Sequence, residues 1–530
     1  MYRSDRERQL DFYHPDIACP HLFKEGSFYY VLREKLDRWV AELDFRPLYS
    51  PDNGRPATSP RALAKALVLQ HLFNLSDRQL EESCRYDMRF KFVLGIPLDD
   101  FGFDHSLFGR FRARLLKDPH YKQVLFRQID LLKAEGYVKP DEAQRIDATH
   151  MVANIAIPSA TELIRQCLRQ VLVKMKRKAN PVYRAFRAAQ EELVRRYLEG
   201  EGARPARGRL TPAERQERLT RVVRDAQTLL AWLEQQPETH PAVARAAELL
   251  HRALFQNTEP APDGSGYREQ SEAHPDRLVS AIDPDARHGA KSQKKKFTGY
   301  KVHQTETTES RIITNVTVTP GNAPDAEPVV ELVKESREQN DLQPSKLLGD
   351  GAHGTGPNRR ALAEEGTPLV APPLPQALAP EVREGKFVFD PESETLTCPA
   401  GVACSQRTYL AESESWLYRF SAAVCRACEL NASCAKGRGG RTLTVSCYYR
   451  EHMAAYLYSQ TPEYKQDMRT RALIEPKNGE LARWHGLRRA RYWGLAKTTL
   501  QAVFTALAVN FKRWVHLATA PNKAATVAVV

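Results

Sequence analysis

Two aspartates that lie far apart in the chain each stand at the end of a predicted β-strand. Asp147 follows the stretch 144–146, and Asp350 follows 346–349. Carboxylates at neighbouring strand ends can hold two divalent metal ions a few ångströms apart, which is what phosphodiester chemistry requires. Gly351 comes directly after the second aspartate and lets the chain leave its strand without crowding a metal ion or a phosphate. The pair therefore predicts a metal centre, provided that the fold brings the two strands together.

A third carboxylate is best sought in the segment 469–477, where Glu475 follows Arg471 by four residues. Glu475 also stands just ahead of a basic stretch, but a solvated glutamate at a helix start, favoured by the helix dipole, would give the same pattern. Asp283 and Asp285 are rival carboxylates, because they precede a basic segment that could be a hairpin edge against DNA. A solvated charge run is the alternative interpretation of that segment. The residues alone leave the third ligand open.

Five of the nine cysteines fall between Cys398 and Cys434. A Cys-x-x-Cys pair, an earlier cysteine on a Cys-Pro-x-Gly turn and a later cysteine suit tetrahedral thiolate coordination of a structural zinc ion. The predicted zinc ligands are Cys398, Cys425, Cys428 and Cys434. Cys404 is the alternative to the first of these, and free thiols in a reducing compartment are the alternative to zinc.

The composition is that of a basic globular protein. The chain has 530 residues, of which 42% are hydrophobic and 27% charged, enough for roughly three or four domains or large insertions. Lysine and arginine number 78 against 65 acidic residues, giving a formal net charge of +13. This balance favours nucleic acid or another polyanion as a partner, although a merely basic enzyme would show it too.

Targeting patterns favour a cytoplasmic protein. The first residues are charged and lack an apolar core, so we expect no signal peptide. No apolar run approaches the ~18 residues that a membrane span needs, and we expect no membrane partner.

The region 1–135 predicts short capped helices. Ser59 can cap a helix that has Pro60 at its first position, and Ser76 opens a capping box. A third helix is expected to begin near Asp104. It carries three arginines suited to a helix-turn-helix-like DNA contact, Arg110, Arg112 and Arg114. A plain helical scaffold with solvent-facing arginines is the alternative.

The stretch 159–256 predicts a pair of long helices, which glycines and a proline break at 200–208. Residues 297–303 and 311–318 predict the two strands of a hairpin. Asp325 is expected to cap a helix that runs to about residue 336. Near the end of the chain, apolar residues from Leu495 to Trp514 predict a helix with a core-facing stripe.

Beyond the N-terminal helices the hydrophobic period thus changes several times. The order strand with Asp147, strand, strand, helix, strand with Asp350, helix matches a ribonuclease-H-like mixed sheet. We expect an α/β core interrupted by a helical insertion and a small cysteine-rich insertion, with an all-α N-terminal domain. The expected boundaries are 1–135 for the helical DNA-binding domain, 140–158 for the first core strand, 159–277 for the helical insertion, 278–372 for the ribonuclease-H-like core, 373–455 for the cysteine-rich insertion, 456–516 for the C-terminal helical part of the core and 517–530 for a tail.

Several segments together resemble bacterial insertion-sequence transposases of the DDE superfamily. Residues 75–82 and 104–111 look like the helical N-terminal domain of that family, and 283–287 followed by 297–301 looks like its central hairpin. The segment 350–353, Asp-Gly-Ala-His, matches the second catalytic segment, which more often reads Asp-x-Gly-Tyr. These motifs span about residues 60 to 515. Each motif is weak alone, and the combination is specific.

Members of this group often carry a Tyr-(2)-Arg-(3)-Glu-(6)-Lys signature around the catalytic glutamate. Arg471 and Glu475 fit that spacing. Met468 stands where tyrosine is expected, and Ala482 stands where lysine is expected, with Arg483 beside it. The departures concern the accessory positions of the signature.

The resemblance implies a two-metal phosphoryl transfer that needs no covalent protein–DNA intermediate. Asp147, Asp350 and Glu475 would hold Mg²⁺ or Mn²⁺ and act on the inverted-repeat ends of the protein's own element. Because two ends must be bound, the resemblance also implies a homodimer on DNA. A bacterial protein that acts on DNA would be associated with the nucleoid in the cytoplasm. A metal-dependent nuclease on the same fold and a catalytically inactive DNA-binding relic are the alternatives.

The predicted DNA contacts outside the N-terminal region are basic residues of the hairpin and of the C-terminal helical part. They are Arg287, Lys294, Lys295, Lys296, Lys301, Arg471, Arg483, Arg488, Arg489 and Arg491.

Overall fold

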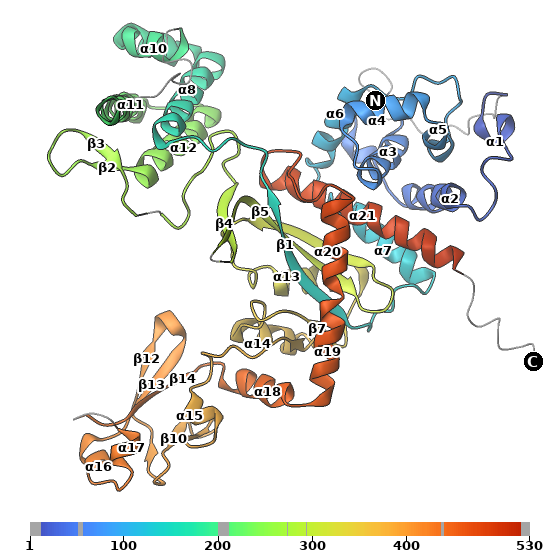
Figure 1. Ribbon diagram of the computed structural model, residues 1–530. Helices are drawn as coiled ribbons and strands as arrows, with labels where there is room; N and C mark the ends of the chain where they lie inside the picture. The colour runs from blue at the N-terminus through green and yellow to red at the C-terminus, as the bar shows by residue number, and fades with distance from the viewer. Residues whose placement is uncertain are drawn as a thin grey trace, which may run out of the picture.

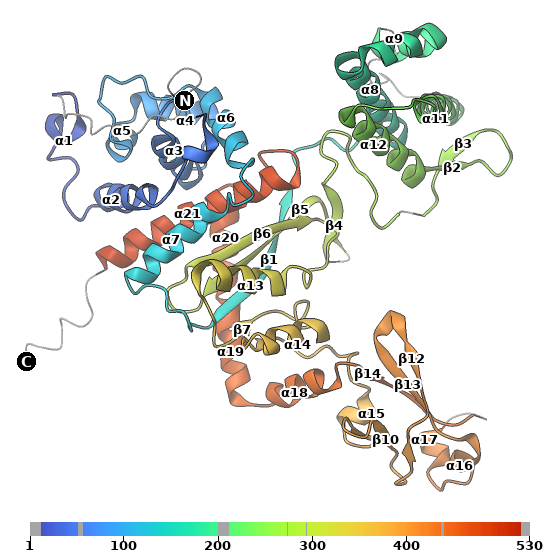
Figure 2. The same ribbon diagram turned by 180° about the vertical axis from the view of Figure 1, so that it is seen from behind.

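The computed structural model describes residues 12–50, 57–199, 211–272, 274–292, 294–435 and 439–520. It combines a mixed β-sheet with many helices, as the α/β fold class requires (Figure 1). Figures 1 and 2 show a helical insertion and a cysteine-bearing lobe projecting from different sides of the central sheet. Among the described helices, none is long and apolar enough to cross a membrane.

The N-terminal region is helical, as expected. Ser59 and Asp104 accept hydrogen bonds from the first turns of their helices, and Ser76 forms a capping box with Gln79. These caps satisfy backbone N–H groups that the first helical turn leaves without partners. The elements are α1 Pro15–Ala18, α2 Phe28–Ala41, η1 Arg46–Leu48, α3 Pro60–Leu72, α4 Asp77–Tyr86, α5 Met88–Leu94, α6 His105–Leu115 and α7 Gln123–Ala134.

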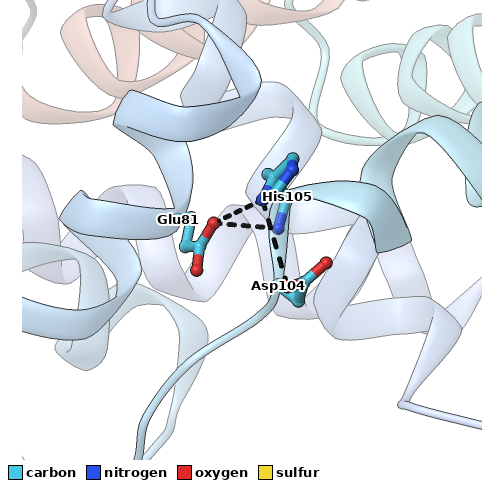
Figure 3. A group of neighbouring side chains, drawn as sticks. All are labelled: Glu81, Asp104 and His105. Carbon is cyan, nitrogen blue, oxygen red and sulfur yellow. Dashed lines mark hydrogen bonds and ion pairs between the residues drawn. The ribbon is translucent and has the colours of Figure 1, made fainter.

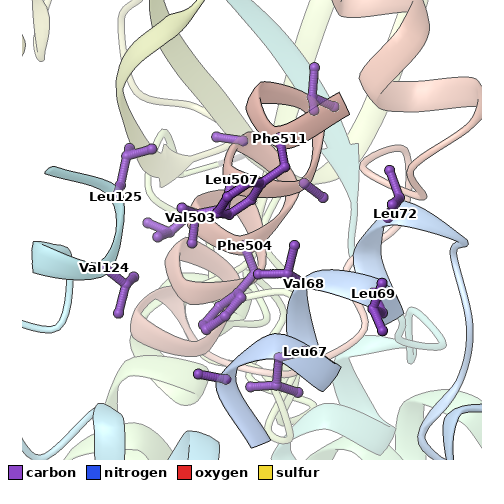
Figure 4. Close-up of a cluster of buried hydrophobic side chains, with 14 of the residues drawn as sticks. Leu67, Val68, Leu69, Leu72, Val124, Leu125, Val503, Phe504, Leu507 and Phe511 are labelled. Carbon is purple, nitrogen blue, oxygen red and sulfur yellow. The ribbon is translucent and has the colours of Figure 1, made fainter. Parts of the chain in front are cut away.

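The last helix, α21 (Leu495–Thr519), ties the N-terminal helices to the sheet. Figure 4 shows Phe504, Leu507 and Phe511 packed among side chains of α3 and α7. The apolar stripe predicted for this helix is confirmed, since its members from Leu500 to Trp514 are buried. One continuous core therefore runs through the N-terminal helices, α21 and the sheet.

The central sheet has the order β4–β5–β1–β7–β8, with β6 pairing on β5. β1 is antiparallel to β5 and parallel to β7, and β7 is parallel to β8. The strands are β1 Gln144–Val152, β4 Arg287–Ser292, β5 Lys295–Thr307, β6 Ile313–Pro320, β7 Leu347–Leu348 and β8 Leu369–Val370. Strands β5 and β6 confirm the predicted hairpin, and β4 pairs with β5 at the end of the strand order, in agreement with the hairpin edge expected before it.

Two helices cover one side of the sheet, α13 (Val329–Asn340) and α14 (Gly356–Glu364). Sequence reasoning placed the start of the first helix at Asp325, but the helix begins four residues later with Pro328 at the N-cap. Asp325 instead pairs with Lys301 of β5 at 2.8 Å. An ion pair with the sheet thus replaces the expected helix cap.

The helical insertion follows β1 and has a core of its own. Its elements are α8 Ala160–Lys178, α9 Asn180–Ala189, α10 Glu191–Leu198, α11 Pro212–Glu234, α12 Pro241–Asn257 and the hairpin of β2 Thr258–Pro260 with β3 Tyr267–Glu269. The helical character expected for this region is confirmed. The region forms more helices than the pair of long ones that the sequence predicts. The predicted break at 200–208 lies outside the described residues.

The cysteine-bearing lobe contains two small antiparallel sheets, ordered β11–β10–β9 and β12–β13–β14, around a separate small core. Its elements are α15 Pro380–Arg383, β9 Val388–Asp390, β10 Thr395–Thr397, β11 Ala403–Cys404, β12 Arg407–Leu410, η3 Ala411–Ser413, β13 Ser415–Arg419, α16 Ala422–Arg426, α17 Asn431–Cys434 and β14 Thr442–Ser446. The chain then returns to the sheet through α18 Tyr449–Ser459, α19 Pro462–Ala472 and α20 Ile474–Arg483.

Candidate active site

The register of the two parallel strands places the predicted aspartates level with each other. Arg145 of β1 pairs with Leu348 of β7. Asp147 and Asp350 each lie two residues beyond that pair, and successive side chains alternate between faces, so both belong to the same face of the sheet. Asp147 lies inside β1 rather than at its end, because pairing with β5 continues the strand to Val152.

Arg471, at the end of α19, lies among all three predicted carboxylates. One guanidinium nitrogen is 3.7 Å from Oδ1 of Asp147 and 3.8 Å from Oδ2 of Asp350. The other is 3.8 Å from Oε1 of Glu475. The three carboxylates predicted from separate parts of the chain therefore converge on one cation.

Asp147 is held by an amide as well as by its backbone. The Asn478 side chain donates to Oδ2 at 2.8 Å, and the Ala148 N–H donates to Oδ1 at 2.9 Å. The Asn478 oxygen accepts in turn from Gln304 of β5 at 2.7 Å. Burial raises the pKa of Asp147, and the nearby Asp350 raises it further, while Arg471 opposes both. Two donors thus orient the carboxylate, but burial makes its ionised form less stable than it would be in water.

Asp350 is held by the turn that follows β7. Its Oδ1 accepts from the backbone N–H groups of Ala352 at 3.0 Å and His353 at 3.3 Å, and Nδ1 of the buried His353 lies 2.6 Å away. Burial acts to raise the pKa of Asp350, but the contacts and charge of His353, together with Arg471, outweigh it and lower the pKa to about 2. Asp350 is therefore an anion at neutral pH.

Glu475 reaches the site from α20, which packs against β1. Ile474, Lys477 and Leu481 are buried on the inner side of this helix, and the Lys477 ammonium lies 3.9 Å from the buried Glu306. This anchoring leaves the Glu475 side chain 70% exposed at the mouth of the site. Glu475 is thus the most exposed of the three carboxylates.

A cavity of about 730 Å³ opens above the carboxylates and is bordered by cations. Lys291, Arg483 and Arg488 line it together with Asp147, Asp350 and Glu475. A second cavity of about 450 Å³ adjoins it and shares Lys291 and Arg488. That cavity is also lined by Lys294, Lys295 and Lys296 of the β4–β5 hairpin. The lining thus combines three carboxylates, which suit divalent cations, with basic side chains, which suit a polyanion.

Three of the predicted DNA contacts have structural partners instead. Arg112 is buried and pairs with Asp77 at the start of α4. Arg287 is buried and pairs with Asp276, and Arg491 donates to the Leu75 carbonyl and the Asn74 side chain. Their guanidinium groups fasten loops and helices to one another, which gives these three residues a structural role, and a DNA contact for them stays a prediction.

The remaining predicted contacts differ in exposure. Arg114 is half-buried, with its guanidinium 4.5 Å from the Tyr49 ring centroid, and Lys301 pairs with Asp325 while lining the main cavity. The others are exposed, and several of them line the two cavities: Arg110, Lys294, Lys295, Lys296, Arg483, Arg488 and Arg489.

The rival carboxylates of the hairpin lie elsewhere. Asp283 is buried and accepts hydrogen bonds from the Tyr300 hydroxyl and the Gly494 N–H. Asp285 accepts from the Leu495 N–H at 2.8 Å. Both therefore fasten the start of α21 to the sheet, and neither lines the cavity that contains Glu475.

Sequence reasoning missed Asn478 and His353 as partners of the aspartates. Asn478 follows Glu475 by three residues and therefore shares its helix face, a signal that helical spacing offers once Glu475 is suspected. His353 follows Asp350 by three residues on a turn, and no periodicity announces a contact of this kind.

One further group of possible metal ligands lies in the N-terminal region (Figure 3). Among the described residues, Glu81, Asp104 and His105 are the one set of three or more whose ligand atoms lie within 4.8 Å of one another. Glu81 accepts from the His105 backbone and ring, and Asp104 caps α6 through the Ser106 N–H. Helix capping accounts for this cluster without a metal ion.

Comparison with known proteins gives two matches and two empty results. A transposase domain model (DUF772) matches residues 19–114, and a transposase DDE domain model matches residues 397–515, which include Glu475. No curated protein and no solved structure matches the chain. The N-terminal match covers the capped helices, and the C-terminal match covers the helices that bring Arg471 and Glu475 to the sheet. Together the two matches confirm the resemblance drawn from the motifs and support the assignment of this chain to the DDE transposases of insertion sequences.

Proposed function

We propose that this transposase cleaves DNA at the inverted-repeat ends of its own element and joins those ends to a target, with Asp147, Asp350 and Glu475 as the ligands of two divalent metal ions. The observation that carries the proposal is the convergence of these three carboxylates, from two parallel strands and one later helix, on Arg471. Fold analogy adds support, because the chain order β1, β5, β6, α13, β7, α14 agrees with the order predicted for a ribonuclease-H-like core.

The residues present fit divalent cations. Transposases of the DDE type generally depend on divalent metal ions. Here Asp350 is ionised at neutral pH, and burial raises the pKa of Asp147 although Arg471 lies beside it. Arg471 supplies one positive charge to three carboxylates at 3.7–3.8 Å. When bound, Mg²⁺ or Mn²⁺ would activate water or a DNA 3′-hydroxyl and stabilise the leaving oxygen.

The protein's own groups position the reactants. Asn478 and the Ala148 N–H fix the orientation of Asp147, and the turn at Ala352 and His353 fixes that of Asp350. Asp147 lies in β1, and Asp350 lies on the turn directly after the neighbouring parallel strand β7, so their spacing is set before substrate binds. Lys291 and Arg488, which border both cavities, would hold the phosphates that flank the scissile bond.

The rim lysines would bind the DNA backbone without reading its sequence. Lys294, Lys295 and Lys296 are exposed beside the cavity and can neutralise consecutive phosphates. Specific recognition of the inverted repeats is assigned to the N-terminal helices, where Arg110 is exposed on α6. Two ends must be held for joining, so we propose a homodimer on DNA, which light scattering of the protein–DNA complex would measure.

The test is Mg²⁺-dependent cleavage and joining of a duplex that carries the flanking element ends. Asp147→Asn, Asp350→Asn and Glu475→Gln should lose both activities while retaining end binding. Asp285→Asn is the matched control, because it changes a carboxylate that caps α21 outside the cavity. Cleavage without joining would indicate a nuclease on the same fold. Specific binding without any cleavage by the wild-type protein would indicate an inactive relic.

A further inference from the structure

We propose that Cys398, Cys425, Cys428 and Cys434 bind one structural zinc ion that holds the cysteine-bearing lobe together. The inference concerns a second metal site, separate from the carboxylates, and does not depend on the proposed DNA chemistry. Four thiolates fill the tetrahedral coordination of zinc and leave no position for substrate, so the ion would act on stability alone.

The four cysteines line one pocket of about 660 Å³. Cys398 stands on a turn closed by the Gly401 N–H, which donates to its carbonyl at 2.9 Å. Cys425 lies in α16, Cys428 follows that helix, and Cys434 ends α17. Two short helices and a turn thus deliver the Cys-x-x-Cys pair and both distant cysteines to the same place.

The surroundings of the sulfur atoms suit thiolates. The Arg441 backbone N–H donates to Sγ of Cys425 at 3.4 Å, a contact that stabilises a negatively charged sulfur. All four sulfurs line the same pocket. Four thiolates gathered there would repel one another, and a divalent cation bound between them would remove that repulsion.

The structure separates the proposed ligands from the other cysteines of the lobe. Cys404 is buried in β11, and its Sγ lies 3.2 Å from the Arg419 carbonyl and 3.6 Å from that of Gln406. It does not line the pocket, and neither does Cys447, which follows β14. Cys398 is therefore the better candidate for the first ligand, and Cys447 provides a control thiol within the same lobe.

The lobe has little else to stabilise it. Its buried core consists of eight side chains between two three-stranded sheets, and so small a core usually needs a metal ion or a disulfide. Zn–S bonds of about 2.3 Å place sulfurs roughly 3.8 Å apart. No three of these four sulfurs lie within 4.8 Å of one another, so the turn and the two short helices would close around the ion.

Metal analysis of the full chain, purified without chelator from zinc-supplemented cells, tests the proposal. We expect one zinc per chain by elemental analysis, with at least a tenfold loss of bound zinc in Cys425→Ser and Cys428→Ser. Cys447→Ser and Cys404→Ser should keep the ion. Because a variant can fail to fold, the wild-type protein gives a second measurement. A thiol reagent should modify four more cysteines after a zinc chelator than before it.

Two results would overturn the site. One is a wild-type protein with less than a tenth of an equivalent of zinc and no chelator-dependent change in thiol reactivity. The other is bound zinc that persists in Cys425→Ser and Cys428→Ser but is lost in Cys404→Ser, which would place the ion elsewhere. Either result leaves the carboxylate site untouched, since the cleavage assay is scored separately.

Discussion

The carboxylate cavity and the cysteine pocket are both proposed metal sites, but they rest on different amounts of structure. Asp147 and Asp350 are positioned by the hydrogen-bond register of a six-stranded sheet that a large core supports. The four cysteines are carried by a turn and two short helices beside a core of eight side chains. The first site has its geometry before any ion binds, whereas the second would obtain its geometry from the ion. Metal should therefore supply chemistry at one site and stability at the other.

The largest expected effect is on catalysis at the carboxylates. Asp350→Asn should lower the rate of Mg²⁺-dependent cleavage by about 10³-fold or more, because a metal ligand contributes several kcal/mol to transition-state stabilisation. Circular dichroism of the variant should match the wild-type spectrum, since the sheet rather than the ion holds this site. A variant that loses both its activity and the circular dichroism of the folded protein would contradict the claim that the carboxylate site forms without metal.

Removal of metal should affect the folding of the cysteine-bearing lobe but not that of the central sheet. Stripping zinc with a strong chelator should expose the lobe between residues 378 and 447 to limited proteolysis, while the central sheet stays resistant. Removing Mg²⁺ alone should leave the digestion pattern unchanged. Mass spectrometry of the first fragments locates the cuts. First cuts within the central sheet after zinc removal would contradict this account.

A smaller effect is expected at the basic rim. Replacing Lys294, Lys295 and Lys296 together by alanine should reduce the slope of log K against log salt by about three, because each phosphate contact contributes about 0.9. The matched control replaces three exposed lysines outside both cavities, Lys178, Lys386 and Lys465. Fluorescence anisotropy over a range of salt concentrations measures the slope. Equal slopes for the two triple variants would show that the three hairpin lysines do not contact DNA phosphates.

The smallest effects should be on stability, and they should differ in sign between the two aspartates. The pKa of Asp147 is raised in the folded state, mainly by burial, so its anion destabilises the fold once the pH exceeds that pKa. Asp147→Asn should therefore stabilise the metal-free protein at pH 7. The pKa of Asp350 is lowered to about 2, against about 3.9 unfolded, so its contribution is present above pH 4 and lost as the pH falls towards 2.

Asp350→Asn should accordingly destabilise the metal-free protein at pH 7 and flatten its acid sensitivity. The change at Asp350 should stay near or below about 1 kcal/mol, because its side chain is partly exposed and solvent screens its contacts. Thermal melts at pH 7 and pH 4 with a chelator present give both signs. Changes of the same sign in the two variants would show that the carboxylates do not differ as described.

The sequence predicted those features that local chemistry determines. Ser59, Ser76 and Asp104 cap helices where their side chains and spacing indicated, and the hairpin of β5 and β6 followed from alternating apolar residues. Both aspartates could be singled out as well. Their meeting could not be derived, because it depends on the pairing of β1 with β7, which is a long-range choice.

The features that the sequence did not predict likewise depend on partners that are distant in the chain. Arg112 and Arg491 look like phosphate contacts in a sequence, yet each is fastened by a partner from a distant or neighbouring element. No local pattern distinguishes a buried, paired arginine from an exposed one. Asp325 was assigned to a helix cap for a similar reason, since its actual partner, Lys301, lies on another strand.

The central claim is that Asp147, Asp350 and Glu475 form one metal centre, and iron-mediated cleavage of the protein tests it most directly. Fe²⁺ replaces Mg²⁺ in the full chain, and ascorbate with peroxide then generates radicals that cut the backbone beside the bound ion. We expect cuts at three places, near Asp147, Asp350 and Glu475, that excess Mg²⁺ suppresses. Cuts near Asp283 in place of Glu475, or near Glu81 and Asp104 alone, would contradict it.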